Sequence, residues 1–422
     1  SYDGERMWHP SSSLEATFDF AGSQGKSVVS MVRSLPACGG PELFEEAASI
    51  LEEIELHHVS ILRDLHEAML KLSLRPAKGE AHVQYLPFFP YLLMALHRRT
   101  LKLDYLHCIS RTAAVLATME AWRRNAGYDF VLPIGYERPW ERRGVAEASE
   151  ADPYLLQTYD VRFGNALLLA THNLFFGDRF SVLSPNYGGA AYRTLRNLVV
   201  PLPFTLNCRA WRHAKSSLRR FRVSFAGSQN GETRRLIHRA AVKLQDAGFT
   251  DLAVRFVVED EARAKLAKEP ASVLGAWFGD DVRSFDDLLL KSYFCLVLPG
   301  DVSDLAMRFF HALSAGCVPV IVGGPSTTVP LPFAEFVNYS RFARFAHVGD
   351  VSDAEQLLNS LQVEVDPTDS DPGHMEELLS EISGLFMRHE ECGVVSGEPF
   401  LDLLEKSFQE RWKIWQLLKW YN

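Results

Sequence analysis

The chain contains 422 residues, and its 44 basic and 53 acidic side chains give a formal net charge of −9. This acidic balance disfavours nucleic acids and anionic membrane surfaces as partners. With 47% hydrophobic and 23% charged residues, the composition is that of a globular protein large enough for two domains. There is no run of eighteen apolar residues and Ser1 opens no signal peptide, so any membrane attachment is expected in a segment that this chain lacks.

Helical periodicity alternates with short apolar, β-prone runs through the first half of the chain. Helical patterns cover residues 41–74 and 105–122, and strands are expected at residues 16–21, 82–89, 130–133, 165–171 and 198–203. A polar stretch over residues 139–152 is typical of a surface insertion. We therefore predict a first domain over residues 1–207.

The second half continues this alternation with more strongly apolar strands. Strands are expected at residues 222–227, 252–258, 293–298 and 318–322, and helices from residue 233 and at residues 285–291, 305–315, 353–361, 375–386 and 400–418. This order predicts an α/β domain over residues 208–365, followed by C-terminal helices over residues 366–422.

The six cysteines show neither CxxC nor Cys/His spacing, which gives no sign of a metal centre. Cys295 and Cys317 stand in apolar strand or turn context and are expected to be buried thiols. The acidic pairs at residues 280–281 and 286–287 are expected to cap and solvate helices, so no metal is predicted. One sequon, at residues 338–340, permits N-glycosylation.

The most informative stretch runs over residues 285–320 and contains a strand, a Gly-containing turn, a helix and a second strand. Ser303 is a candidate N-cap of the helix, and Gly316 is expected to end it. In open α/β sheets, ligands bind beyond the carboxyl ends of such strands, where helix N-termini attract phosphate. This pattern indicates a nucleotide site, although a βαβ unit that only packs would look the same.

The sequence of this stretch resembles the nucleotide-sugar-binding half of the exostosin family of glycosyltransferases. The resemblance rests on the segments SYFCLVLPGD, MRFFHALSAGCVPVIV and LPFAEFVNYSRF, and it covers about residues 65–361. The residues that fall on the family pattern are Ser292, Phe294, Cys295, Leu296, Gly300, Arg308, Ala312, Leu313, Gly316, Cys317, Pro319, Val320, Pro332 and Phe333. Two positions depart from it: Pro299 comes one place later than the family's proline, and His311 replaces an acidic residue.

The resemblance implies an α/β fold of two Rossmann-like domains facing a cleft, the GT-B architecture. It implies an acceptor-side first domain, a donor-binding second domain and C-terminal helices that pack back on the first. The donor-binding residues expected are Gly227, Arg234, Arg235, Pro299, Gly300, Ser303, Arg308, His311 and Gly316. Glycine lets backbone amides approach a diphosphate, and arginine binds it through permanently charged, bidentate hydrogen bonds.

In the first domain, the family shows W-N-R-x-G-G-x-D-H where this chain reads WRRNAGYDF at residues 122–130. Asp129 matches, while Phe130 replaces the histidine that could act in acid–base catalysis. The resemblance thus implies Arg308 and Asp129 as catalytic residues. The base that activates the acceptor is left open among Asp129, Glu137 and His82.

Three functions are compatible with these residues. The first is an inverting glycosyltransferase without a metal that uses a nucleotide sugar, by resemblance a UDP-sugar, and a glycan or glycoprotein acceptor. The second is a catalytically quiet exostosin-like module that binds glycan or scaffolds a partner transferase. The third, an unrelated doubly wound nucleotide-binding enzyme, is disfavoured because neither G-x-G-x-x-G nor a P-loop lysine occurs.

The resemblance also carries expectations about location and assembly. Exostosin relatives are usually type II membrane proteins of the Golgi, so this chain is expected in the Golgi lumen or elsewhere in the secretory pathway. It is expected to act either alone or in a homo- or hetero-oligomer.

Overall fold

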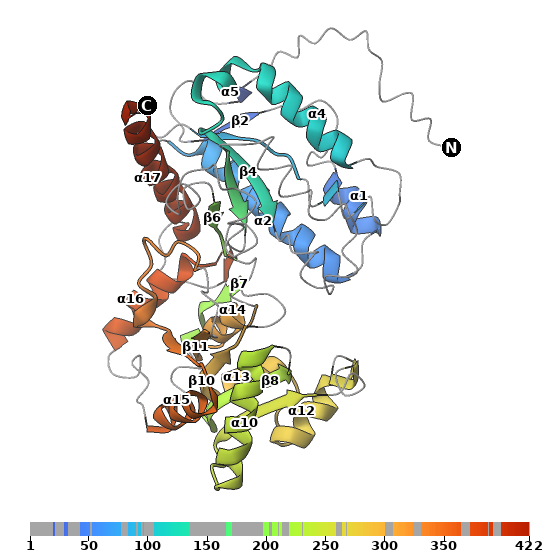
Figure 1. Cartoon of the computed structure of the whole chain (residues 1–422), viewed down its shortest axis with the longest axis vertical. Coiled ribbons are helices and arrows are strands. Elements are labelled where there is room, and N and C mark those ends of the chain that lie inside the picture. The colour runs from blue at the N-terminus through green and yellow to red at the C-terminus, as the bar shows by residue number, and fades with distance from the viewer. Residues whose placement is uncertain are drawn as a thin grey trace. The chain divides into compact units, whose positions relative to one another are not determined.

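The structure is a computed structural model, and the chain separates into two compact units. Unit 1 comprises Ser1–Val200 and Leu401–Asn422, and unit 2 comprises Pro201–Phe400 (Figure 1). The structure describes residues 20–21, 29–32, 43–50, 53–76, 83–89, 92–93, 96, 105–135, 166–170, 197–201, 205–209, 211–212, 219–229, 231–258, 264–266, 268–299, 307–323, 331–363, 372–386, 388–390 and 398–421. The predicted roles of the two domains and their facing cleft stay predictions.

Unit 1 contains a six-stranded sheet in the order β1-β2-β3-β4-β5-β6. Its strands are β1 (Phe20–Ala21), β2 (Val29–Val32), β3 (Val83–Tyr85), β4 (Phe130–Gly135), β5 (Leu167–Ala170) and β6 (Asn197–Val199). Only the β1–β2 pair is antiparallel. Parallel strands buried on both faces read as apolar runs, which is why β4 and β5 are recognisable in the sequence.

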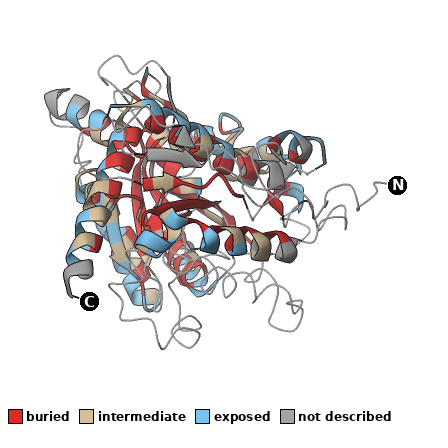
Figure 2. Ribbon diagram, turned by 90° about the horizontal axis from the view of Figure 1, so that it is seen from above, coloured by how far each residue is buried: buried red, intermediate tan, exposed pale blue. Residues whose placement is uncertain are grey.

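Helices of unit 1 include α1 (Leu43–Ile50), α2 (Glu53–Leu74), α4 (Tyr105–Thr118), α5 (Glu120–Asn125) and α17 (Pro399–Tyr421). Helix α2 packs against β2 and β4 through apolar residues such as Leu62, Leu65 and Met69, each wholly buried. Figure 2 shows the same pattern across the chain, with buried residues on the strands and on the helix sides that face them.

Unit 2 is organised around a five-stranded, all-parallel sheet in the order β12-β11-β10-β8-β9. Its strands are β8 (Phe221–Ser228), β9 (Leu252–Val257), β10 (Ser292–Val297), β11 (Val318–Gly323) and β12 (Arg344–His347). Numbered along the chain, this is the order 2-1-3-4-5 of a doubly wound sheet. The α/β fold with parallel sheets expected from the sequence is therefore confirmed.

Helices cover both faces of the unit 2 sheet. One face packs on α10 (Glu232–Asp246) and α15 (Val351–Val363), and the other on α12 (Pro270–Phe278), α13 (Phe285–Leu290) and α14 (Met307–Ser314). The 3-10 turn η1 (Tyr339–Arg341) and α16 (Pro372–Ser383) complete this unit. Strands β7 (Thr205–Asn207) and β13 (Arg388–Glu390), which the sequence did not predict, form a separate parallel pair.

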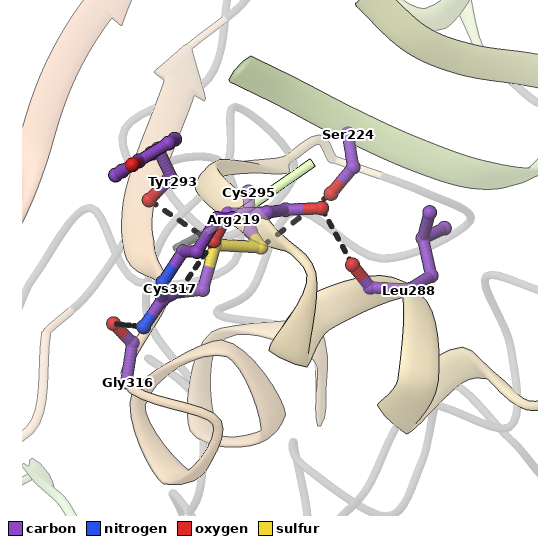
Figure 3. Close-up of a disulfide and its surroundings, with 8 residues drawn as sticks. Arg219, Ser224, Leu288, Tyr293, Cys295, Gly316 and Cys317 are labelled. Carbon is purple, nitrogen blue, oxygen red and sulfur yellow. Dashed lines mark hydrogen bonds between the residues drawn. A yellow bond between two sulfur atoms is a disulfide. The ribbon is translucent and has the colours of Figure 1, made fainter. Parts of the chain in front are cut away.

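Cys295 and Cys317 form a disulfide, which corrects the expectation that they are free buried thiols (Figure 3). Strands β10 and β11 are parallel neighbours, and Cys295 lies opposite Pro319 in their register. This places the Cα atom of Cys317 6.0 Å from that of Cys295, within bridging range. Apolar context reveals burial but not the distance between two thiols. Cys108 and Cys208 are also disulfide-bonded, and none of the described cysteines is free.

Candidate functional site

The candidate site lies where the strand order of unit 2 reverses, between β8 and β10. Both neighbours of this pair, β9 and β11, lie outward from it, so the chain leaves β8 and β10 in opposite directions. Loops at such a switch point diverge and leave room for a ligand beyond the carboxyl ends of the strands. Gly227 and Ser228 end β8 here, and Pro299 follows β10.

At the carboxyl edge of the sheet, where β8 and β10 end, the Arg308 side chain packs against Phe225 and Gly227 of β8. It stands in the first turn of α14, and its guanidinium carbon lies 4.4 Å from the ring centre of Phe225 and 5.9 Å from that of Phe285. A Cβ atom on Gly227 would lie only 2.5 Å from Nη2 of Arg308. A side chain at position 227 would therefore displace the guanidinium of Arg308, which rests against the bare backbone of β8.

Among the residues that the structure describes, no carboxylate balances the charge of Arg308. Within the described part of the chain, no residue forms a hydrogen bond or an ion pair with its guanidinium. Burial, and secondarily the positive charge of Arg234, lower the pKa of Arg308 to about 9. A desolvated cation beside a second cation is unfavourable until an anion arrives. The arrangement is thus prepared for an anionic ligand.

Arg234 connects the two loops that form this edge. Its guanidinium donates to the carbonyl oxygen of Ser228 at 3.0 Å and to its hydroxyl at 3.2 Å, and to the carbonyl oxygen of Pro299 at 2.9 Å. The side chain is buried, with 7% of its surface exposed. Arg234 therefore fixes the spacing of the loops, whereas Arg235, on the next position of α10, is exposed. A direct diphosphate contact by either residue stays a prediction.

His311 lies one turn beyond Arg308 and lines the same pocket. Its Nδ1 is 3.3 Å from Oδ1 of Asp286, which is in the first turn of α13. This hydrogen bond lowers the pKa of the Asp286 carboxyl. The neighbouring Asp287 forms a capping box with Ser284, as helix capping predicts. Sequence reasoning assigned both acids to capping and missed Asp286, because nothing in the sequence places α13 beside His311.

A pocket of about 220 Å³ opens between the sheet and helices α13 and α14. Its lining is mainly apolar, and of the described lining residues only Arg308 and His311 can carry a charge. The described residues that line it are Ser224, Phe225, Ala226, Phe285, Leu288, Leu289, Cys295, Leu296, Met307, Arg308 and His311. Such a combination suits a ligand that carries a negative group next to an apolar or planar one.

The other predicted donor-binding residues are not all brought to this edge. Gly316 ends α14 with a φ of 63°, and its carbonyl oxygen accepts a hydrogen bond of 2.8 Å from Arg219, which precedes β8. Because Arg219 also bonds the carbonyl oxygen of Ser292 at the start of β10, Gly316 lies at the amino edge of the sheet. This placement favours a structural role for Gly316. Gly300 and Ser303 lie outside the described residues.

Asp129 belongs to unit 1, where it directly precedes the first residue of β4 and so lies at the amino end of that strand. Its Oδ2 accepts hydrogen bonds from Asn125 at 2.9 Å and from Gln84 at 3.1 Å. Burial raises the pKa of the Asp129 carboxyl, and its Oδ1 is buried without a hydrogen-bond partner. A catalytic role for Asp129 stays a prediction, and these amide contacts favour a structural one.

The residues around Asp129 explain its setting. Gly127 has a φ of 81°, and a Cβ atom there would lie 2.7 Å from the Trp122 ring. Phe130, which stands where the family has a histidine, is wholly buried with its ring 4.8 Å from that of Trp122. The matching residues of this segment therefore build a compact turn at the start of β4. Glu137 and His82 lie outside the described residues.

The described residues form neither a metal centre nor a membrane-spanning helix. No group of three or more His, Cys, Asp or Glu side chains is placed to hold a metal ion in those ranges. None of the described helices is both long and apolar enough to cross a bilayer.

Comparison with known proteins identifies the family. A search of curated proteins gives no match. The family model described as the Exostosin GT47 domain matches residues 28–361, which is well over half of the chain. The match includes β8, β10 and α14 with Arg308 in unit 2, as well as the parallel strands β2–β6 of unit 1. The chain therefore belongs to the exostosin family of glycosyltransferases.

Proposed function

We propose that this protein is an inverting glycosyltransferase that transfers a sugar from a nucleotide sugar, most simply a UDP-sugar, to a glycan or glycoprotein acceptor. Membership of the exostosin family supports sugar transfer as the reaction class. The observation that carries the donor assignment is Arg308, a cation without an anionic partner in the described residues, at the switch point of a doubly wound sheet.

Sugar transfer breaks the bond between the anomeric carbon and the diphosphate, so negative charge grows on the leaving group. Arg308 would stabilise this charge, because its guanidinium is held in place by Phe225 and Gly227 before the donor binds. Arg234 would act as a positioning residue by setting the spacing of the loops after β8 and β10. The proposed reaction uses these cationic side chains and no resident metal.

Inversion requires that the acceptor hydroxyl attacks the anomeric carbon from the face opposite the diphosphate, with its proton passing to a base. In the proposed arrangement unit 2 binds the donor and unit 1 supplies the acceptor side, facing each other as in GT-B enzymes. The base that accepts this proton stays open among Asp129, Glu137 and His82, and the resemblance implies a catalytic role for Asp129 only in general terms. His311 stands in place of the family's acidic residue. In the proposed reaction its neutral or cationic imidazole would therefore bind the ribose.

The exostosin family is generally found in the secretory pathway. Disulfides persist in oxidising compartments and are rare in the cytosol. The bond between Cys295 and Cys317 therefore supports a secretory location, and we propose the Golgi lumen as the site of action.

A second function is favoured by two specific observations. The position of the family's histidine is taken by Phe130, a wholly buried core residue, and that of its acid by His311, which pairs with Asp286. The first change removes an imidazole that could act in catalysis, and the second replaces a carboxylate with an imidazole. The alternative is therefore a catalytically inactive exostosin-like module that binds glycan or scaffolds a partner transferase.

Isothermal titration calorimetry with a panel of nucleotide sugars and free nucleoside diphosphates tests the transferase proposal. We expect diphosphate-dependent binding, with Arg308→Ala weakening it roughly ten- to hundredfold, since a hydrogen bond to a charged group contributes about 1.5–3 kcal/mol. Arg239→Ala, an exposed arginine on α10, is the matched control and should leave affinity unchanged. If none of the nucleotides gave a binding heat, or if both variants lost affinity equally, the proposal would be contradicted. Glycan binding without nucleotide binding would instead support the inactive module.

A further inference from the structure

The chain contains a single Asn-x-Ser/Thr sequon, Asn338-Tyr339-Ser340. In the structure it forms the start of η1, with Asn338 at the N-cap position. Asn338 and Ser340 are exposed, whereas Tyr339 between them is 4% exposed. The turn thus presents to solvent the two side chains that define the sequon, and it buries only the residue whose identity the sequon leaves free.

The turn is anchored through groups other than the Asn338 amide nitrogen. The Tyr339 hydroxyl donates a hydrogen bond of 2.6 Å to the carbonyl oxygen of Pro332. The backbone N–H of Asn338 donates to Oε1 of Glu381 on α16 at 3.0 Å, and Arg341 pairs with the same carboxylate at 2.9 Å. A group attached to the side-chain nitrogen of Asn338 would therefore break none of these contacts.

The Asn338 carboxamide is also held in one orientation. The Ser340 hydroxyl donates a hydrogen bond of 2.7 Å to Oδ1 of Asn338. Within the described residues, Nδ2 of Asn338 takes part in no hydrogen bond, so it is free to face solvent. The same hydroxyl that defines the sequon therefore directs the nucleophilic nitrogen outward.

We infer that Asn338 is an N-glycosylation site whose donor is a lipid-diphosphate-linked oligosaccharide. In the transfer, a C–N bond forms between Nδ2 and the anomeric carbon of the oligosaccharide, and the C–O bond to the lipid diphosphate breaks. One amide proton passes to a base of the transferring enzyme, and the lipid diphosphate leaves. The inference rests on the proposed secretory location, which the disulfide between Cys295 and Cys317 supports independently of the donor site.

Translation of the full chain, fused to a secretion leader, in the presence of endoplasmic-reticulum microsomes tests this site. Only protease-protected, imported chains are scored. We expect one discrete loss of mass on treatment with peptide N-glycosidase F, and conversion of Asn338 to aspartate in the peptide map. Asn338→Gln and Ser340→Ala should abolish the change, and Ser340→Thr should keep it. Asn359→Gln, which removes an exposed asparagine outside any sequon, is the control and should also keep it.

An imported wild-type chain without a glycan on Asn338 would overturn the inference, as would a mass change that persists in Asn338→Gln. Peptide mapping of the wild-type chain reads the site directly, so a poorly folding variant cannot obscure the answer. Because the leader imports the chain whatever its native compartment, failure here is distinguishable from failure of the nucleotide-sugar proposal, which calorimetry measures.

Discussion

At the scale of single residues, the contact between His311 and Asp286 defines how the site differs from the family pattern. An acidic residue one turn after Arg308 would lie on the same helix face and offset its charge. Here the carboxylate comes from another helix, α13, and contacts His311 instead. Within the described residues Arg308 has no carboxylate partner, and the carboxylate of Asp286 contacts His311, which lines the same pocket as Arg308. The contact between Asp286 and His311 depends on how α13 packs beside α14, so no single sequence motif predicts it.

The pairing predicts a measurable titration of Asp286. Its carboxyl pKa is lowered chiefly by the hydrogen bond from His311, so His311→Gln should raise it toward the ordinary value near 4. Carboxyl-carbon NMR across an acid titration reads this directly. His347→Gln, which removes an exposed histidine of β12, is the matched control and should leave the Asp286 pKa unchanged. An Asp286 titration curve identical in wild type and His311→Gln would disprove the pairing.

The same shift fixes the sign of the effect on stability. A carboxyl with a lowered pKa in the folded state stabilises the protein above its unfolded-state pKa, and that stabilisation is lost as the pH falls through the folded-state value. The Asp286 side chain is 70% exposed, so solvent screening limits the contribution to below about 1 kcal/mol. Asp286 therefore matters for the charge arrangement of the pocket more than for folding.

At the scale of elements, the strands and helices of unit 2 could be predicted because their sequence signals are local. The apolar run of β10 and the glycine that ends α14 with a left-handed conformation both match the structure. The pairing of β7 with β13 could not be predicted, because these three-residue strands lie far apart in the chain and neither has a clear period. The placement of Arg308 followed from its helix turn, whereas its partner Phe285 and the nearby Asp286 depend on how α13 packs.

The disulfide between Cys295 and Cys317 links two neighbouring elements of unit 2. It closes a covalent loop that contains the end of β10 and all of α14, including Arg308 and His311. For a sequence separation of 22 residues, loss of loop-closure entropy in the unfolded chain stabilises the fold by about 3 kcal/mol. The bond also restricts the segment that carries the candidate anion site.

We expect the double variant Cys295→Ala/Cys317→Ala to lower the free energy of unfolding of unit 2 by about 3 kcal/mol, measured by urea denaturation. The double variant avoids the reduction of the other disulfides that a chemical reductant would cause. Ser224→Ala, which removes the hydroxyl 3.5 Å from the Cys295 sulfur without opening the loop, is the control and should cost much less. An unchanged midpoint and slope in the double variant would show that the covalent loop does not stabilise this unit.

At the scale of the whole molecule, unit 1 is built from two distant parts of the chain, and α17 supplies the second part. The residues of unit 2 lie between them in sequence. Within unit 1, Asp402 of α17 pairs with Arg75 at 2.8 Å, and the Trp415 ring lies 5.9 Å from that of Tyr128. Leu404 and Phe408 of α17 are wholly buried. The folding of unit 1 is therefore completed only by the last residues of the chain.

This discontinuity predicts that a core substitution in α17 destabilises unit 1 rather than unit 2, although unit 2 is adjacent to α17 in the sequence. Phe408→Ala should destabilise unit 1 by about 3–5 kcal/mol, because a wholly buried aromatic side chain is replaced by a cavity. Hydrogen-exchange mass spectrometry should show faster exchange in α2 and β4, with α10 and β8 unchanged. Leu417→Ala is the control, since that side chain is 63% exposed. Equal loss of protection in α10 would mean that the two units unfold as one, and no change in α2 would mean that α17 is not part of the unit 1 core.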